Sequence, residues 1–248
     1  MNLAIIQARL GSTRLPNKVL MDLGDKKVIE HVVDRVGRGS FIDEIIVATT
    51  ILKQDLSLVK FCSQRNIRVF VGSEDDVLDR YYQVAKLLQP VNVIRITSDC
   101  PLIDPEIIDL VGKHHVISKG DYTSNTLDET YPDGLDVEIM TFEALESAWK
   151  ESTLRSEREH VTPFIKKNPD RFKSVSVRNE TNLATMRWTL DQIEDYNFLS
   201  KIFERLYVKN RSFNTKDVLK EIANDPSLLK INGGIIRNEG YLKSLTKD

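Results

Sequence analysis

Apolar runs alternate with segments of helical periodicity along the first half of the chain, and this alternation most constrains the fold. The runs, which contain β-branched residues, cover 3–8, 43–50, 67–71 and 91–97. Apolar residues recur every three or four positions in 27–38, 55–64 and 77–88, and again from 104–111. Strands that alternate with helices form parallel sheets covered on both faces. We therefore expect an α/β fold with a mostly parallel central sheet and helices on both faces.

The second half is less regular and predicts a smaller β-containing insertion. Strand patterns cover 135–140, 174–177 and 184–188. Helical patterns cover 142–152, 157–168 with an interruption at Pro163, 192–207 and 214–223. The sequence shows no internal repeat and no low-complexity linker, so we expect a single domain over residues 1–248.

Composition excludes several classes of protein. Lys and Arg total 35 against 37 Asp and Glu, a formal charge of -2, so we expect no nucleic-acid partner. No run of about 18 apolar residues is present, and the N-terminal residues have no basic leader, so we expect no membrane span and no signal peptide. The two cysteines, Cys62 and Cys100, suit a reducing compartment, and the cytoplasm is the expected location.

The stretch 9-RLGSTRLPNK-18 directly follows the first predicted strand. A phosphate cradle needs converging backbone N–H groups and cations, and this stretch offers Gly11, Ser12, Thr13, Arg14 and Lys18. It matches neither the P-loop pattern nor GxGxxG. Composition alone favours a solvated turn. Ligands of parallel sheets, however, bind beyond the carboxyl ends of strands, and this position favours a phosphate site.

Two aspartates lie at similar positions. Asp99, in 97-TSDCPLID-104, follows the fourth predicted strand and could hold a divalent cation or close a turn. Asp104 reads as a plain helix N-cap before Pro105. Asp191 could cap the helix over 192–207, with Glu194 completing a capping box, or could be a second metal ligand.

Several segments together resemble one enzyme family. The run 5-IIQARLGSTRLPNKVLMDLG-24 resembles the nucleotide-binding signature of sugar nucleotidyltransferases. It is most similar to cytidylyltransferases of the spore coat polysaccharide biosynthesis protein F type, relatives of the enzymes that activate 3-deoxy-manno-octulosonate and sialic acids with CTP. The similarity continues through 72–81, 95–105, 122–138, 156–165, 187–195 and 231–245, nearly the whole chain.

The resemblance implies a Rossmann-like nucleotide-diphospho-sugar transferase fold and transfer of CMP from CTP to a sugar, with Mg²⁺. Residues 1–118 would form the nucleotide-binding half, and 119–248 the sugar-binding half, through which a homodimer could form. Nucleotide contacts are expected from Ala8, Arg9, Leu10, Gly11, Ser12, Thr13, Arg14, Lys18, Arg80, Thr97 and Ser98. The expected catalytic residues are Arg14, Lys18 and Asp99, and the expected metal ligands are Asp99 and Asp191. Sugar contacts are expected from Tyr131, Asp133, Asp136, Glu138, Arg158 and His160.

Other readings remain open at this point. A sugar acid would need an arginine such as Arg158, whereas the acidic residues at 133, 136 and 138 suit hydroxyls or an amine. His160 could equally be a core histidine, and His31, His114 and His115 are expected on helix surfaces. A metal-dependent glycosyltransferase that uses a sugar nucleotide, or a non-catalytic nucleotide-binding relative, would have similar sequence features.

Overall fold

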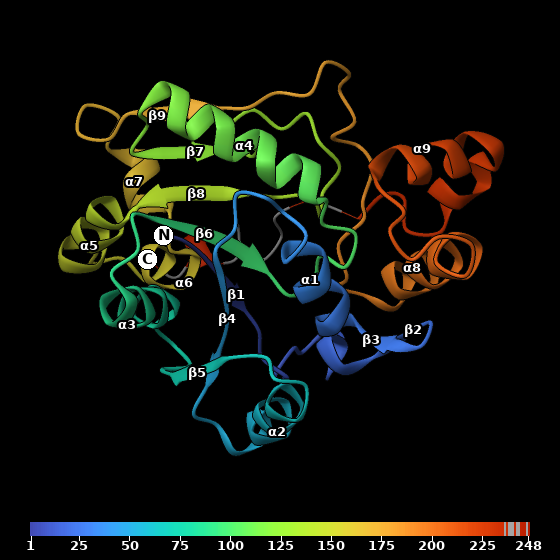
Figure 1. The fold of residues 1–248 in the computed structure, drawn as a ribbon, viewed down its shortest axis with the longest axis horizontal. Helices are drawn as coiled ribbons and strands as arrows, with labels where there is room; N and C mark the ends of the chain where they lie inside the picture. Colours follow the sequence, from blue (N-terminus) through green and yellow to red (C-terminus); the bar gives the residue numbers. More distant parts are fainter. Residues whose placement is uncertain (236, 238–240, 242–243, 247) are drawn as a thin grey trace.

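A seven-stranded sheet forms the centre of the computed structural model, which describes residues 1–235, 237, 241, 244–246 and 248 (Figure 1). Its order is β5-β4-β1-β6-β8-β7-β9. The strands are β1 (Asn2–Gln7), β4 (Glu44–Thr50), β5 (Val69–Gly72), β6 (Asn92–Thr97), β7 (Tyr122–Ser124), β8 (Glu138–Thr141) and β9 (Ser174–Ser176). Only β8 pairs antiparallel with its neighbours within this described sheet, so the expected mostly parallel sheet is confirmed.

The strand register brings several loops to one edge of the sheet. Gln7 lies opposite both Ala48 and Thr97, so β1, β4 and β6 end at nearly the same level. Because β8 runs the other way, its first residue, Glu138, lies opposite Arg95 near the end of β6. The chain that enters β8 therefore reaches the same edge as the chain that leaves β1 and β6.

Side chains of β1 alternate between two cores. Ala4 and Ile6 pack with α1 (Val28–Val36), α2 (Leu56–Gln64) and α4 (Pro105–Ser118). Leu3 and Ile5 pack with α3 (Val77–Leu88) and α5 (Phe142–Glu151) on the other face. A strand buried on both faces reads as the continuous apolar run seen at 3–8. The expected helices on both faces are confirmed.

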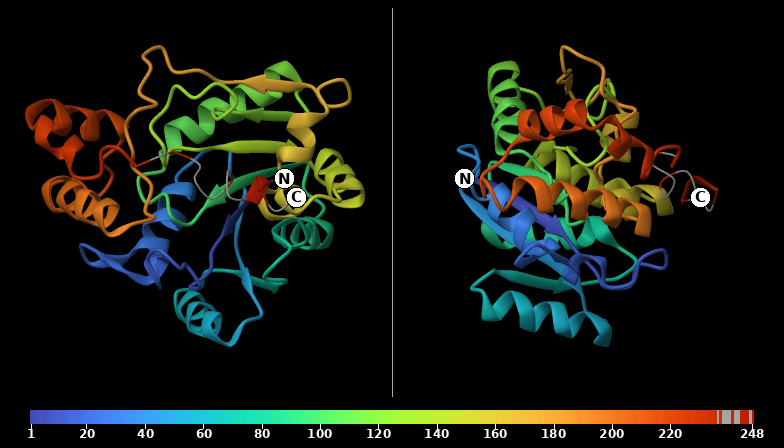
Figure 2. Two further views of the ribbon diagram at one scale, coloured as in Figure 1. Left: turned by 180° about the vertical axis from the view of Figure 1, so that it is seen from behind. Right: turned by 90° about the vertical axis from the view of Figure 1, so that its right-hand side faces the viewer.

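The later helices flank this sheet. In Figures 1 and 2, α8 (Ile193–Leu206) and α9 (Thr215–Asn224) lie together at one side, where α8 contacts the small β2–β3 hairpin (Asp22–Leu23 and Lys26–Lys27). Further helical elements are α6 (Arg155–His160), α7 (Pro163–Lys167) and the 3-10 turns η1 (Lys18–Leu20), η2 (Lys53–Asp55) and η3 (Pro226–Lys230). The predicted interruption at Pro163 is confirmed, because α7 begins there. Part of the similarity segment 231–245 lies outside the described residues.

The predicted strand over 184–188 is wrong. The segment begins in a turn at 184–185, and its one sheet-like contact within the described chain is an isolated bridge between Asp133 and Arg187. The amide of Trp188 donates to the Asp133 carbonyl at 2.6 Å and the amide of Leu190 to the Asp99 carbonyl at 2.8 Å. The segment therefore joins two loops instead of extending the sheet.

Two of the three histidines expected on helix surfaces are buried. A ring nitrogen of His31 lies 2.7 Å from the Leu23 carbonyl oxygen, and the His31 ring packs 4.5 Å from that of Phe203. His115 bonds through its ring nitrogens to Thr123 at 2.9 Å and to Asn92. Buried imidazoles stay in the core when both faces and both nitrogens have partners. His114 is exposed, as expected.

Both cysteines are free and buried, and no helix of the described residues is long and apolar enough to cross a lipid bilayer.

Gly134 should be essential to the junction between the 125–137 connection and residues 187–190. Its φ is +111°, and an added β-carbon would lie 2.6 Å from the Thr189 backbone nitrogen. We expect Gly134→Ala to lower the free energy of unfolding by about 2–5 kcal/mol, measured by urea denaturation. Gly234→Ala is the matched control, because Gly234 has φ of +88° but nothing within 4 Å. Equal losses in the two variants would show that overlap contributes nothing.

Candidate active site

A cleft of ≈ 690 Å³ opens at the carboxyl edge of β1 and β6. It is lined by many of the residues that the sequence singled out: Ala8, Arg9, Ser12, Thr13, Arg14, Lys18, Arg80, Thr97, Ser98, Asp99, Asp133, Asp136, His160 and Asp191. Leu10, Gly11, Tyr131, Glu138 and Arg158 are not part of its lining. The geometry brings both halves of the chain to one cleft, and the roles of individual residues stay predictions.

The loop after β1 is held from below by Asp55. The buried Asp55 carboxylate accepts from the Leu10 amide at 2.6 Å and also from the Thr50 hydroxyl. The Leu10 amide is therefore already bonded, and its expected contact to a phosphate is not supported. A β-carbon at Gly11 would lie 2.5 Å from Nε2 of Gln54, the end of an exposed, flexible side chain that can move aside. The loop is a preformed turn that presents its later residues to the cleft.

Lys18 lies at the centre of the polar contacts. Its Nζ donates to Oδ2 of Asp99 at 2.7 Å and to Oδ1 of Asp191 at 2.5 Å, and Arg14 donates to the other oxygen of Asp191 at 2.9 Å. Burial alone would lower the pKa of Lys18, but the two carboxylates outweigh it and raise the pKa. Burial likewise opposes ionisation of Asp99, yet the Lys18 ammonium holds the pKa of Asp99 at about 2. Lys18 and Asp99 are thus both charged at neutral pH.

Asp99 and Asp191 are the residues that could hold a metal. Within the described residues, no group of three or more His, Cys, Asp or Glu side chains could enclose an ion. Mg²⁺, however, is typically held by one or two carboxylates together with substrate phosphates and water. Two carboxylates converging on one cation at this open cleft fit that chemistry, and they do not fit an all-protein zinc or calcium cage.

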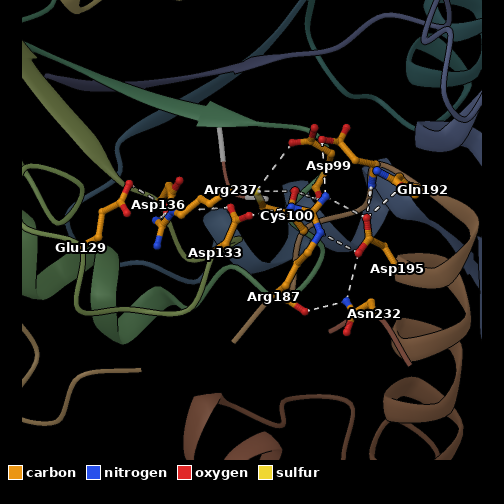
Figure 3. A network of polar contacts seen from close by, with 12 residues as sticks. Asp99, Cys100, Glu129, Asp133, Asp136, Arg187, Gln192, Asp195, Asn232 and Arg237 are labelled. Carbon is orange, nitrogen blue, oxygen red and sulfur yellow. Dashed lines mark hydrogen bonds and ion pairs between the residues drawn. The ribbon is translucent and has the colours of Figure 1, made fainter. Parts of the chain in front are cut away.

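Arg187 and Asp195, which bind each other (Figure 3), fix the position of Asp191. Arg187 donates two hydrogen bonds to the fully buried Asp195, at 2.8 and 3.0 Å, and one to Asp133 at 2.9 Å. Asp195 also accepts from the backbone amides of Asp191 and Gln192. The expected cap of α8 at Asp191 with Glu194 is therefore wrong: Gln192 is the N-cap and Asp195 is the third helical residue. Asp191 lies before the helix, with its carboxylate directed to Lys18.

The acidic residues expected at the sugar have different surroundings. Burial, with the nearby Asp136 carboxylate, raises the pKa of Asp133 to about 7. Asp136 accepts from Arg237 at 2.8 Å (Figure 3). Glu138 and Tyr131 are buried away from the cleft. Because the Glu138 carboxylate is bound by neighbouring side chains, the expected direct contact between Glu138 and a sugar is not supported.

Arg158 and His160 are both tied to neighbouring elements. Arg158 donates to Asp76 at 2.9 Å and to the Trp149 carbonyl at 2.7 Å, outside the cleft, so its expected contact to a sugar is not supported. Asp76 is also the N-cap of α3, where its carboxylate accepts from the Asp79 amide. His160 lines the cleft and bonds to the Ser244 hydroxyl at 2.8 Å. Burial, followed by the nearby positive charge of Arg95, lowers the pKa of His160 to about 4, so it is neutral at pH 7.

Arg80 lines the other end of the cleft, beside the loop after β1. It is 2% exposed and donates to the Ser73 carbonyl at 2.7 Å, while its Nε is buried without a hydrogen-bond partner in the described structure. Burial lowers the pKa of Arg80. Thr97 and Ser98 complete this end, where Ser98 bonds through its amide to the Gln7 carbonyl.

Comparison with known proteins identifies the family. A family model described as cytidylyltransferase matches residues 3–222. The chain belongs to the cytidylyltransferase family.

This cytidylyltransferase is 37% identical over 244 residues to an uncharacterized protein of Methanocaldococcus jannaschii, covering 96% of this chain and 97% of that protein. It is 33% identical over 215 residues to the spore coat polysaccharide biosynthesis protein SpsF of Bacillus subtilis, covering 82% and 86% of the two chains. The structure of a cytidylyltransferase from Leptospira borgpetersenii superposes with a TM-score of 0.88 at 32% identity, covering 95% of this chain and 99% of that one. The family confirms that the protein is a nucleotidyltransferase with a Rossmann-like fold.

Sequence reasoning missed several side chains that line or support the cleft. Arg187 and Asp195 were not singled out as a pair, and Arg95, Arg155 and Glu159 also line the cleft or its wall. For Arg95 a signal was present, because a lone arginine interrupts the buried run 91-VNVIRIT-97. Charged residues in fully buried strands are almost always paired or functional. Asp195 gave no such signal, since acidic residues are common in the first turn of any helix.

Removing the Asp195 carboxylate should destabilise the protein and displace Asp191. Arg187 would lose its bidentate partner while remaining buried, and such broken pairs cost about 3–5 kcal/mol. We expect Asp195→Ala to lose about that much unfolding free energy in urea denaturation. Its neighbour Glu194 is exposed, so Glu194→Ala should change stability by less than about 0.5 kcal/mol. A similar small change in Asp195→Ala would contradict the structural role assigned to it.

Proposed function

We propose that this cytidylyltransferase transfers CMP from CTP to a sugar and releases pyrophosphate in the cytoplasm. The proposed acceptor is an acidic or amino sugar that is used for the synthesis of surface polysaccharide. The observation that carries the proposal is the convergence of Arg14, Lys18, Asp99 and Asp191 at the end of β1. Two cations and two carboxylates at this edge suit a triphosphate with its metal. SpsF is named for polysaccharide biosynthesis, which supports a sugar acceptor.

The proposed reaction is a direct in-line displacement. A sugar hydroxyl oxygen attacks the α-phosphorus of CTP, and the bond from that phosphorus to the α,β-bridging oxygen breaks. Pyrophosphate leaves, and the hydroxyl proton is released to water. Charge grows on the leaving oxygen and the non-bridging oxygens, so positioned cations lower the barrier. Arg14 and Lys18 supply those cations, and no buried cysteine is needed as a nucleophile.

Lys18 and Arg14 would divide the binding of the triphosphate. The Lys18 ammonium is a compact charge at the end of a mostly buried side chain, whereas the Arg14 guanidinium can contact two oxygens at once. The Lys18 side chain is 11% exposed and that of Arg14 is 34% exposed. Lys18 would therefore bind nearest the reacting phosphate, and Arg14 nearer the departing pyrophosphate.

Asp99 and Asp191 would hold Mg²⁺ in this proposal. The bound ion would neutralise phosphate charge and orient the triphosphate. The protein's part is to hold both carboxylates in place: Arg187 and Asp195 hold Asp191 from behind, and the Leu190 amide binds the Asp99 carbonyl. Arg80 and Ala8 would lie at the base and ribose end of the cleft.

Lys18→Ala should reduce turnover on the order of 10²-fold or more, because it removes a cation from the transferring phosphates. The measurement is the initial rate of pyrophosphate release. Lys18→Arg restores the charge and should recover part of the rate, and Lys60→Ala, which truncates an exposed lysine of α2, is the matched surface control. Near-normal turnover in Lys18→Ala would refute the role of Lys18.

The function itself is tested by a screen of the four ribonucleoside triphosphates against acidic, amino and neutral sugars. We expect CTP to give the fastest pyrophosphate release, only in the presence of Mg²⁺, and Asp99→Asn to require a higher Mg²⁺ concentration for half-maximal rate. A glycosyltransferase would instead consume a finished sugar nucleotide and release no pyrophosphate. Binding of CTP and Mg²⁺ in a thermal-shift assay without pyrophosphate release would indicate a non-catalytic relative.

A further inference from the structure

Arg95 occupies an unusual place in the sheet. It lies on β6, four residues before Asp99, and its side chain is 14% exposed and lines the cleft. Its neighbours Ile94 and Ile96 are fully in the core. A guanidinium in a central strand is costly to bury, so its contacts need a specific reason.

The contacts of Arg95 leave part of its guanidinium unsatisfied. Nη1 donates to the Glu138 carboxylate, while Nε is buried and has no hydrogen-bond partner among the described residues. Glu138 is shared, because it also accepts from Lys166 at 2.9 Å, from Thr162 at 2.7 Å and from the Tyr122 hydroxyl. Among the described residues, four side chains bind the Glu138 carboxylate, whereas the buried Nε of Arg95 has no hydrogen-bond acceptor.

The charges at this point do not balance. Arg95 and Lys166 together carry two positive charges, and both form ion pairs with the single negative charge of Glu138. Burial opposes ionisation of Glu138, yet Lys166 and Arg95 hold its pKa well below the usual range, so the count holds at neutral pH. Arg95, Lys166 and Glu138 together retain one positive charge, and Arg95 is the member of the three that faces the cleft, where Asp136 is a further acidic neighbour.

Two other arginines near the cleft have carboxylates of their own. Arg187 is bound by Asp195 and Asp133, and Arg158 by Asp76. Two acidic residues of the cleft lining also have arginine partners, because Asp133 accepts from Arg187 and Asp136 accepts from Arg237. His160, on the same wall as Arg95, is neutral at pH 7 and offers no competing charge.

We propose that Arg95 binds the carboxylate of an acidic sugar acceptor and so selects acids over neutral and amino sugars. The proposal rests on the proposed transfer of CMP to a sugar and names the chemical class of that sugar. A guanidinium that is already oriented by Glu138 can offer its remaining N–H groups to a carboxylate in a fixed fork. The ligand would also supply the acceptor that the buried Nε lacks. Arg158, the arginine that the sequence suggested for this role, is held by Asp76 instead.

The test is direct binding of sugar acids and of their methyl esters, which remove only the charge. The probes are 3-deoxy-manno-octulosonate, N-acetylneuraminate and glucuronate, each with its ester, measured by ligand-observed NMR without nucleotide. For at least one acid, we expect the wild-type protein to bind the acid about tenfold or more tightly than its ester. Arg95→Met should abolish this preference and Arg95→Lys should retain part of it, with CTP affinity unchanged as evidence of an intact fold.

Arg155→Met is the matched control, because Arg155 is a second arginine of the cleft wall and is exposed. It should keep the acid preference. Loss of the preference in Arg155→Met but not in Arg95→Met would overturn the assignment. The assignment would also be overturned if every acid and its ester bound with equal affinity, or if neither bound. Preferential binding of glucosamine would also overturn it and would indicate Glu159, whose carboxylate accepts from Ser244 in the same wall.

Failure of this proposal and failure of the proposed function are distinguishable. An Arg95-dependent acid preference in a protein that releases no pyrophosphate with any nucleotide would overturn the function and leave the anion site standing. Pyrophosphate release that is confined to neutral or amino sugars would confirm the reaction and overturn the role of Arg95.

Discussion

A single ammonium group shared by two carboxylates joins the parts of this molecule that the chain places far apart. Lys18 comes from the turn after β1, Asp99 from the turn after β6, and Asp191 from the segment before α8. Each carboxylate would be costly to bury at this edge without the cation, and the cation would be costly without them. The sheet register and the Arg187–Asp195 pair both serve to keep these three groups within hydrogen-bond distance.

The parallel part of this arrangement could be predicted from periodicity. Apolar runs at 3–8 and 91–97 are dense enough to require burial on both faces, and that burial implies a parallel sheet with helices on either side. Once the sheet is parallel, the turns after those runs must share an edge. The sequence therefore predicts that the turns carrying Lys18 and Asp99 lie together, although it does not predict which atoms bond.

The pairing of the charged side chains could not be predicted, because the sequence offers several similar residues for each partner. Glu194 and Asp195 are adjacent acids in one helical turn, and only the docking of Arg187 decides that Asp195 is buried. Arg158 and Arg95 are both arginines near acids, and packing of α6 against α3 commits one to Asp76 while the sheet directs the other to the cleft. Local patterns predict elements well, but the pairing of long charged side chains is a property of the assembled fold.

The reversed direction of β8 has a consequence for how such enzymes could diversify. The 125–137 connection is fixed at both ends by two strands that pair with each other, Ser124 lying opposite Glu138. Its middle, however, docks on the segment before α8, because Asp133 binds the Arg187 side chain and exchanges backbone hydrogen bonds with Met186 and Trp188. A change in this connection would be transmitted through Arg187 to Asp191, so this connection and the edge of the sheet at Lys18 would have to change together.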